Sequence, residues 1–121
     1  MQLSSILVSP FLLAGLSAVC HRSGEYWPAN TEDLKRQIHD WLRDTGGLKG
    51  SYYAGELKSV CIAISSSAHA DLEIQRLGSR GVLTKDECSE YLRREIDACP
   101  QGGRRTYDNW VFSADPNAGP C

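Results

Sequence analysis

The sequence predicts a small α+β domain in which two helices pack on one face of a four-stranded antiparallel sheet. Three observations lead to this fold class: two amphipathic helical segments, segments of alternating apolar and polar residues, and a chain of only 121 residues. In order, the predicted elements are strand, helix, strand, strand, helix and strand. This βαββαβ order is that of the split βαβ, ferredoxin-like sandwich.

The N-terminal segment is expected to be a secretory signal peptide. Residues 1–20 carry no charged side chain, and their apolar run at 6–14 is too short to span a bilayer. We therefore expect residues 1–20 to be removed, residues 21–121 to form one domain, and the protein to be secreted into the extracellular space.

The expected cleavage site decides how many cysteines remain. The five cysteines are Cys20, Cys61, Cys88, Cys99 and Cys121. Ala18 and Cys20 would stand at positions −3 and −1 of a cut before His21, which leaves four cysteines and two disulfides. A cut after Ser17 or Ala18 would leave five cysteines and a spare thiol. We favour the cut after Cys20.

The first strand is expected around residues 25–27, and the first helix follows it. Asn30 or Thr31 can cap this helix, and the next two residues are acidic, as the helix dipole favours. From Leu34, apolar residues recur at i, i+4, i+7 and i+8, which makes one apolar stripe. Gly46-Gly47 is expected to end the helix.

Two strands are predicted between the helices. Val60, Ile62 and Ile64 alternate with less apolar residues, and so do Leu72 and Ile74. Residues 65–67 and those that follow would form the turn between these strands.

The second helix begins with a capping box, in which Thr84 is the N-cap and Glu87 the N3 residue. Pro100 and Gly102-Gly103 should stop it, and a last strand is expected at 106–114. Asp115-Pro116-Asn117 has the composition of a turn.

This fold suggests a pairing for the cysteines. The last strand would return Cys121 to the start of the second helix, near Cys88, and this would leave Cys61 for Cys99. We expect the disulfides Cys88–Cys121 and Cys61–Cys99, although four cysteines allow three connectivities.

The sequence predicts neither a cofactor nor a metal site. No C-x-x-C occurs, and the histidines show no ligand spacing. A net charge of −2 at pH 7 disfavours nucleic acid as a partner and also disfavours a cationic, membrane-disrupting peptide. Stable membrane insertion is not expected either.

No catalytic residue is assigned. Ser65–Ser67, His69 and Asp71 are close in sequence, but neighbouring strand residues alternate faces, so a polar hairpin tip is the preferred interpretation. The main alternative is a small secreted ribonuclease. Its candidate residues are Glu56, His69, Glu73, Arg104 and Tyr107.

Aromatic and basic residues suggest a binding surface. Tyr52 and Tyr53 form one pair and Arg104 and Arg105 another, and we take these four residues as a possible binding surface. A carbohydrate-binding or cell-wall-binding module that uses Tyr26, Tyr52 and Tyr53 is a further alternative.

A family resemblance covers residues 88–121. It is carried by two cysteines on the second helix, a diglycine, and the terminal pattern W-x-F-x-x-D-P-N-x-G-x-C, which here comprises Cys88, Leu92, Ile96, Asp97, Cys99, Gly102, Gly103, Trp110, Phe112, Asp115, Pro116, Asn117, Gly119 and Cys121. This segment resembles small secreted fungal proteins, namely killer-toxin-like proteins and necrosis-inducing effectors.

The resemblance implies an α/β sandwich that acts in virulence or competition without catalysis. Its partner would be a host or competitor protein, or a cell-wall glycan. This chain has fewer cysteines than those toxins and an acidic balance, so blockade of an ion channel by a basic patch is not expected.

Overall fold

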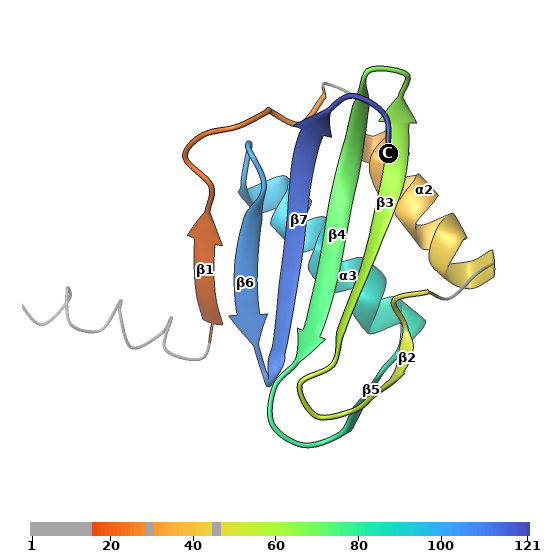
Figure 1. Ribbon diagram of the computed structural model, residues 1–121, viewed down its shortest axis with the longest axis vertical. Coiled ribbons are helices and arrows are strands. Elements are labelled where there is room, and N and C mark those ends of the chain that lie inside the picture. The colour runs from red at the N-terminus through yellow and green to blue at the C-terminus, as the bar shows by residue number, and fades with distance from the viewer. Residues whose placement is uncertain (1–15, 29–30, 45–46) are drawn as a thin grey trace, which may run out of the picture.

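The computed structural model describes residues 16–28, 31–44 and 47–121 and confirms an α+β architecture with two helices and antiparallel sheets (Figure 1). The larger sheet has five described strands in the order β1-β6-β7-β4-β3. Their bounds are β1 Leu16–Cys20, β3 Leu57–Ser65, β4 Ala68–Arg76, β6 Gly103–Tyr107 and β7 Trp110–Ala118. A smaller sheet joins β2, Gly50–Tyr52, to β5, Gly81–Leu83.

The predicted four-stranded sheet is wrong in two places. The first strand is β1, inside the predicted signal peptide, whereas residues 25–27 lie outside the strands. The predicted last strand is a hairpin, because Asp108 and Asn109 both have positive φ and turn β6 into β7. Two such residues are typical of a type I′ turn. Residues 1–15 of the predicted signal peptide lie outside the described residues.

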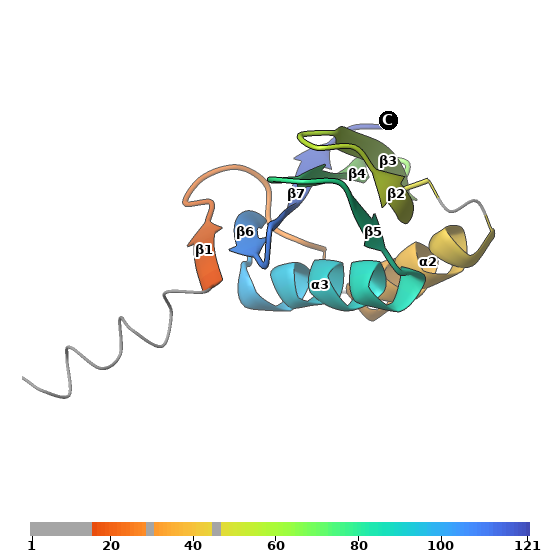
Figure 2. The same cartoon turned by 90° about the horizontal axis from the view of Figure 1, so that it is seen from below.

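Both helices lie on one face of the larger sheet (Figure 2). Helix α2, Thr31–Asp44, buries Leu34, Ile38 and Leu42 of the predicted stripe, and its fourth member, Trp41, is partly buried against the same core. Helix α3, Lys85–Ala98, begins with the predicted capping box, which is confirmed in both directions between Thr84 and Glu87. No helix of the described residues packs on the other face of the sheet.

The core lies between the helices and the sheet. Tyr91 of α3 packs against Phe112 of β7, with ring centroids 4.8 Å apart. Tyr52 and Trp110 meet edge to face at 5.0 Å and close the end of the core beside the smaller sheet. The fully buried apolar side chains of this core include Leu34, Ile38, Leu42, Leu48, Tyr52, Ala70, Leu72, Ile74, Leu92, Phe112 and Ala114.

The predicted disulfide pairing is also wrong. The bonds are Cys20–Cys99 and Cys61–Cys121, and Cys88 is a free thiol buried in the core. The reason is that Cys61 lies on the face of β3 turned away from α3, where Cys121 can reach it. A cut after Cys20 would remove one partner of the first bond, whereas cuts after Ser17 or Ala18 would keep it.

The disulfides tie both ends of the described chain to the fold. Cys20 joins β1, at the edge of the sheet, to Cys99 at the C-cap of α3. Trp27 strengthens the same junction, because its indole Nε1 donates to the Cys99 carbonyl at 2.9 Å. Two disulfides are typical of proteins that fold in an oxidising, commonly extracellular, compartment.

The turn from α3 into β6 generates a first prediction. Gly102 has φ +83°, and a Cβ there would lie 2.6 Å from the Ala114 carbonyl oxygen. Gly119 has a similar φ of +88° but open space around it, so it is a matched control. We expect Gly119→Ala to lower the free energy of unfolding by about 1–2 kcal/mol through backbone strain alone. Gly102→Ala should lower it by about 1–3 kcal/mol more, because of the clash. Equal losses in urea unfolding would contradict the close approach.

Candidate functional site

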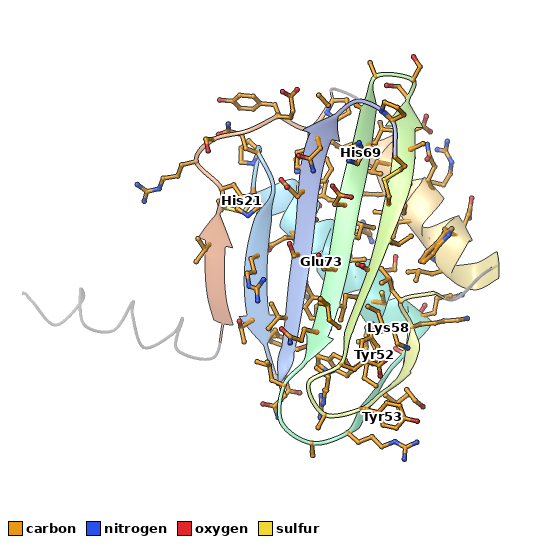
Figure 3. All side chains as sticks on the ribbon, in the orientation of Figure 1. His21, Tyr52, Tyr53, Lys58, His69 and Glu73 are labelled. Carbon is orange, nitrogen blue, oxygen red and sulfur yellow. A yellow bond between two sulfur atoms is a disulfide. The ribbon has the colours of Figure 1, made fainter. Side chains whose placement is uncertain are left out.

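The face of the larger sheet without helices is polar, and we call it the open face. In β4 the side chains of Ala70, Leu72 and Ile74 are buried, so the alternating side chains between them point to the open face. These are His69, Asp71 and Glu73, and Figure 3 shows His69 and Glu73 on this side of the sheet. In β7 the open-face residues include Ser113, Asp115 and Asn117.

The strand register places two carboxylates directly opposite each other. Asp71 of β4 pairs with Asp115 of β7, and such like-charged pairs destabilise a sheet unless a partner lies between them. The Asn117 amide supplies that partner. Its Nδ2 donates to Asp71 Oδ2 at 2.7 Å and to Asp115 Oδ2 at 3.3 Å.

A histidine lies at each end of this acidic pair. His69 Nε2 is 3.1 Å from Asp71 Oδ2, and His69 Nδ1 is 2.8 Å from the Gly119 carbonyl oxygen. On the other side, His21 Nδ1 is 3.3 Å from Asp115 Oδ1. The polar network therefore runs from His69 through two aspartates and one asparagine to His21, across the strands and the segment after β1.

The contacts of His69 favour its charged form. The hydrogen bond to the Gly119 carbonyl raises the pKa of His69 most, burial works in the opposite direction, and the nearby Asp71 and Asp115 carboxylates raise it further. Both ring nitrogens face oxygen acceptors, so the doubly protonated imidazolium satisfies both contacts.

The open face is hollowed along these strands. A groove of about 450 Å³ is lined by residues from β3, β4, β7 and the segment after β1. Its lining residues are His21, Ser59, Val60, Cys61, Asp71, Leu72, Glu73, Ser113 and Asp115. Three of these side chains are carboxylates, and none is a lysine or an arginine.

A basic side chain, that of Arg104, lies beside the groove. Arg104 is exposed and pairs with Ser113, which in turn pairs with Glu73 in the next strand. Among the described residues, the open face therefore includes three acids and two histidines, with Arg104 at its side.

The four residues predicted as a binding surface do not form one surface. Tyr52 is fully buried and its hydroxyl donates to the Leu48 carbonyl, and burial raises the pKa of its phenol. Tyr53 is 72% exposed, but it lies at the end of the molecule beside the smaller sheet, far from His21 and His69 (Figure 3). Arg104 reaches the open face, whereas Arg105 points to the helices.

Arg105 has a structural role. Its Nε donates to Glu95 Oε1 at 3.2 Å, and the Glu95 side chain is 0% exposed. Burial raises the pKa of Glu95, and the Arg105 charge opposes that shift. Arg105 thus compensates an acid buried between α3 and the sheet.

The residues proposed for a ribonuclease site do not lie together either. His69, Glu73 and Arg104 lie on the open face, but Tyr107 packs against Tyr91 on the helix side, with ring centroids 5.0 Å apart. Glu56 lies in the loop before β3, where its carboxylate accepts a hydrogen bond from the Tyr53 amide.

Sequence reasoning missed His21, Asp115 and Asn117 as members of one site. Asp115 to Asn117 belong to β7 and not to a turn. Pro116 has no backbone N–H to donate to a neighbouring strand. It fits β7 because its ring Cδ faces Gly102, which lies just before β6 begins, so no strand hydrogen bond is needed on that side. The alternation Ser113-x-Asp115-x-Asn117, read like that of His69-x-Asp71-x-Glu73, was the signal that could have shown the shared face.

No protein-family model matches the chain, and no curated protein matches it either. Within the described ranges, neither helix is long and apolar enough to cross a membrane.

The buried ion pair yields a second prediction. Replacing Arg105 by leucine leaves the Glu95 carboxylate buried without its compensating charge, so Arg105→Leu should lower the free energy of unfolding by about 3–5 kcal/mol. Arg104→Leu, the matched control on the open face, should change it by less than about 0.5 kcal/mol. Adding Glu95→Met to Arg105→Leu should restore most of the loss. Similar losses for both arginines in urea unfolding would contradict this role.

A third prediction concerns pH. Because the pKa of His69 is raised in the folded state, its contribution to stability is complete below about pH 6.5, the unfolded value. That contribution is lost as the pH rises through the folded value. The difference in unfolding free energy between the wild type and His69→Gln should therefore shrink as the pH increases. If the difference in unfolding free energy stays constant with pH, it does not come from the contacts of His69 with the Gly119 carbonyl and Asp71.

Proposed function

We propose that this protein is a secreted, disulfide-stapled binding protein that recognises a cationic segment of a host or competitor protein on the open face, without catalysis. The resemblance of residues 88–121 to killer-toxin-like and necrosis-inducing proteins implies a secreted protein that acts on a host or competitor without catalysis, and the proposal adopts that part of the role. The observation that carries the proposal is the groove of the open face, in which the described lining residues include three carboxylates and no lysine or arginine.

The charge of the groove selects the class of partner. Asp71 and Glu73 of β4 and Asp115 of β7 put three negative charges on the groove, which outnumber the positive charges of Arg104 and a protonated His69 beside it. Such a surface repels the phosphates of nucleic acid and attracts lysine and arginine side chains. The described residues that line the groove include no tryptophan, tyrosine or phenylalanine, the side chains on which sugar rings typically stack.

The hydrogen bonds of the face support binding over chemistry. A general base must reach the proton that it removes, and both ring nitrogens of His69 already face acceptors. Asn117 holds Asp71 and Asp115 together, which fixes the position of both carboxylates. A rigid, pre-organised acidic surface loses little conformational entropy when it binds a cationic partner.

The test compares an oligo-lysine and an oligo-glutamate peptide by calorimetry with the purified protein at low salt. We expect only oligo-lysine to bind, with Asp71→Asn and Glu73→Gln each weakening binding by about 2–5-fold. The matched control is Asp86→Asn, an exposed acid in the first turn of α3 that changes the net charge equally. Added salt should weaken binding.

Two results would contradict the proposal. If Asp86→Asn weakens oligo-lysine binding as much as the open-face variants do, the attraction comes from net charge and not from the groove. If the protein cleaves RNA or a glycan, and His69→Gln or Glu73→Gln abolishes that activity, the protein is an enzyme.

A further inference from the structure

We propose that reduction of the Cys61–Cys121 disulfide creates a zinc site with four ligands, Cys61, Cys121, His69 and Asp71. This inference goes beyond the proposed target binding and does not rest on it. It starts from the side chains that the strand register gathers at one end of the open face.

The donor atoms already converge. Cys61 of β3 pairs with Asp71 of β4, and Ala63 of β3 pairs with His69, so these side chains share the open face. One donor atom from each of Cys61, His69 and Asp71 lies within 4.8 Å of the other two. Cys121 Sγ adds the fourth donor, because it is bonded to Cys61 Sγ. Figure 3 shows His69 at the end of the sheet where the C-terminal segment crosses β4.

His69 has the arrangement of a metal-binding histidine. Its Nδ1 can donate to the Gly119 carbonyl at 2.8 Å, and this leaves the Nε2 lone pair directed at Asp71 Oδ2, 3.1 Å away. A backbone carbonyl that fixes the tautomer in this way is the usual second partner of a zinc-bound imidazole. A nitrogen lone pair and a carboxylate oxygen repel each other at 3.1 Å unless a cation lies between them. For His69 Nε2 and Asp71 Oδ2 that cation is either a proton or a metal ion.

The oxidation state of the cysteines decides which cation can bind. In the disulfide neither sulfur is a thiolate, so only nitrogen and oxygen donors remain. A dithiol reductant breaks the S–S bond with two electrons and two protons and is itself oxidised to a disulfide. Zinc then binds both sulfurs as thiolates, and the two thiol protons pass to the solvent.

The required movement is small. Two thiolates on a tetrahedral zinc ion lie about 3.8 Å apart, so the two sulfurs must separate by about 2 Å. Cys121 follows β7 in an exposed segment that can supply this shift. The Gly119 amide, which donates to the Ser67 carbonyl at 2.8 Å, keeps that segment near His69. Two sulfurs, one nitrogen and one oxygen form a ligand set that zinc accepts.

Reduction and zinc binding therefore replace the disulfide cross-link by a metal cross-link. In an oxidising compartment the covalent bond holds the C-terminal segment on β3. In a reducing compartment that contains zinc, the metal ion holds the same two segments at the same place.

The test is a titration of the full reduced protein with Co²⁺, followed by displacement with Zn²⁺. We expect one Co²⁺ per chain, with tetrahedral d–d bands and the thiolate charge-transfer intensity of two sulfurs. The oxidised protein should show neither. Cys61→Ser, His69→Gln and Asp71→Asn should each weaken metal binding by more than roughly 10–100-fold, the loss typical when a group that only hydrogen-bonds to a metal ligand is removed.

Controls separate this site from the other thiols and histidines. His39→Gln on α2 and Cys88→Ala should keep full affinity, and so should the double variant Cys20→Ser/Cys99→Ser. If the reduced chain unfolds without metal, zinc should restore its circular dichroism and raise its Tm. Failure of zinc to refold the chain, no cobalt spectrum in a folded reduced protein, or a spectrum that survives Cys61→Ser would overturn the proposal.

Discussion

The pairing of β4 with β7 is the constraint on which the rest of the structure depends. Nine residue pairs, from Ala68↔Ala118 to Arg76↔Trp110, fix the register of the two strands. Because strand side chains alternate, this register directs Leu72 and Phe112 to the helices, and Asp71 and Asp115 to the open face. A slip of one residue would bury the acidic side chains and expose the apolar ones. The same register therefore determines both the packing against α2 and α3 and the composition of the open face.

The disulfides and the polar network hold this arrangement at its edges. Cys20–Cys99 ties the edge strand β1 to the end of α3, and Cys61–Cys121 ties the segment after β7 to β3. Asn117 relieves the repulsion between the facing aspartates, and His69 joins that pair to the Gly119 carbonyl. The same residues that fix the C-terminal segment therefore shape the proposed binding groove, and they supply the ligands of the proposed zinc site.

Local signals predicted the helices better than they predicted the sheet. The apolar stripe from Leu34 and the capping box at Thr84 are short-range patterns, and both helices form as these patterns indicate. The hairpin at Asp108-Asn109 was missed because neither residue is glycine, and β1 was missed because its apolar sequence is equally typical of a signal peptide. The site was missed for a further reason. His69 and Asp71 lie near Asp115 and Asn117 only through strand pairing, which no local pattern specifies.

Peptide mapping of the disulfides in the non-reduced protein tests the register most directly. Cys61 can meet Cys121 only if β3 presents it on the open face, and Cys20 can meet Cys99 only if the mature chain retains β1's last residue. We expect Cys20–Cys99 and Cys61–Cys121, with Cys88 alkylated only after denaturation. Peptides linked through Cys88–Cys121 or Cys61–Cys99 would contradict both the register and the open face derived from it, and a chain that begins at His21 would contradict the Cys20–Cys99 bond.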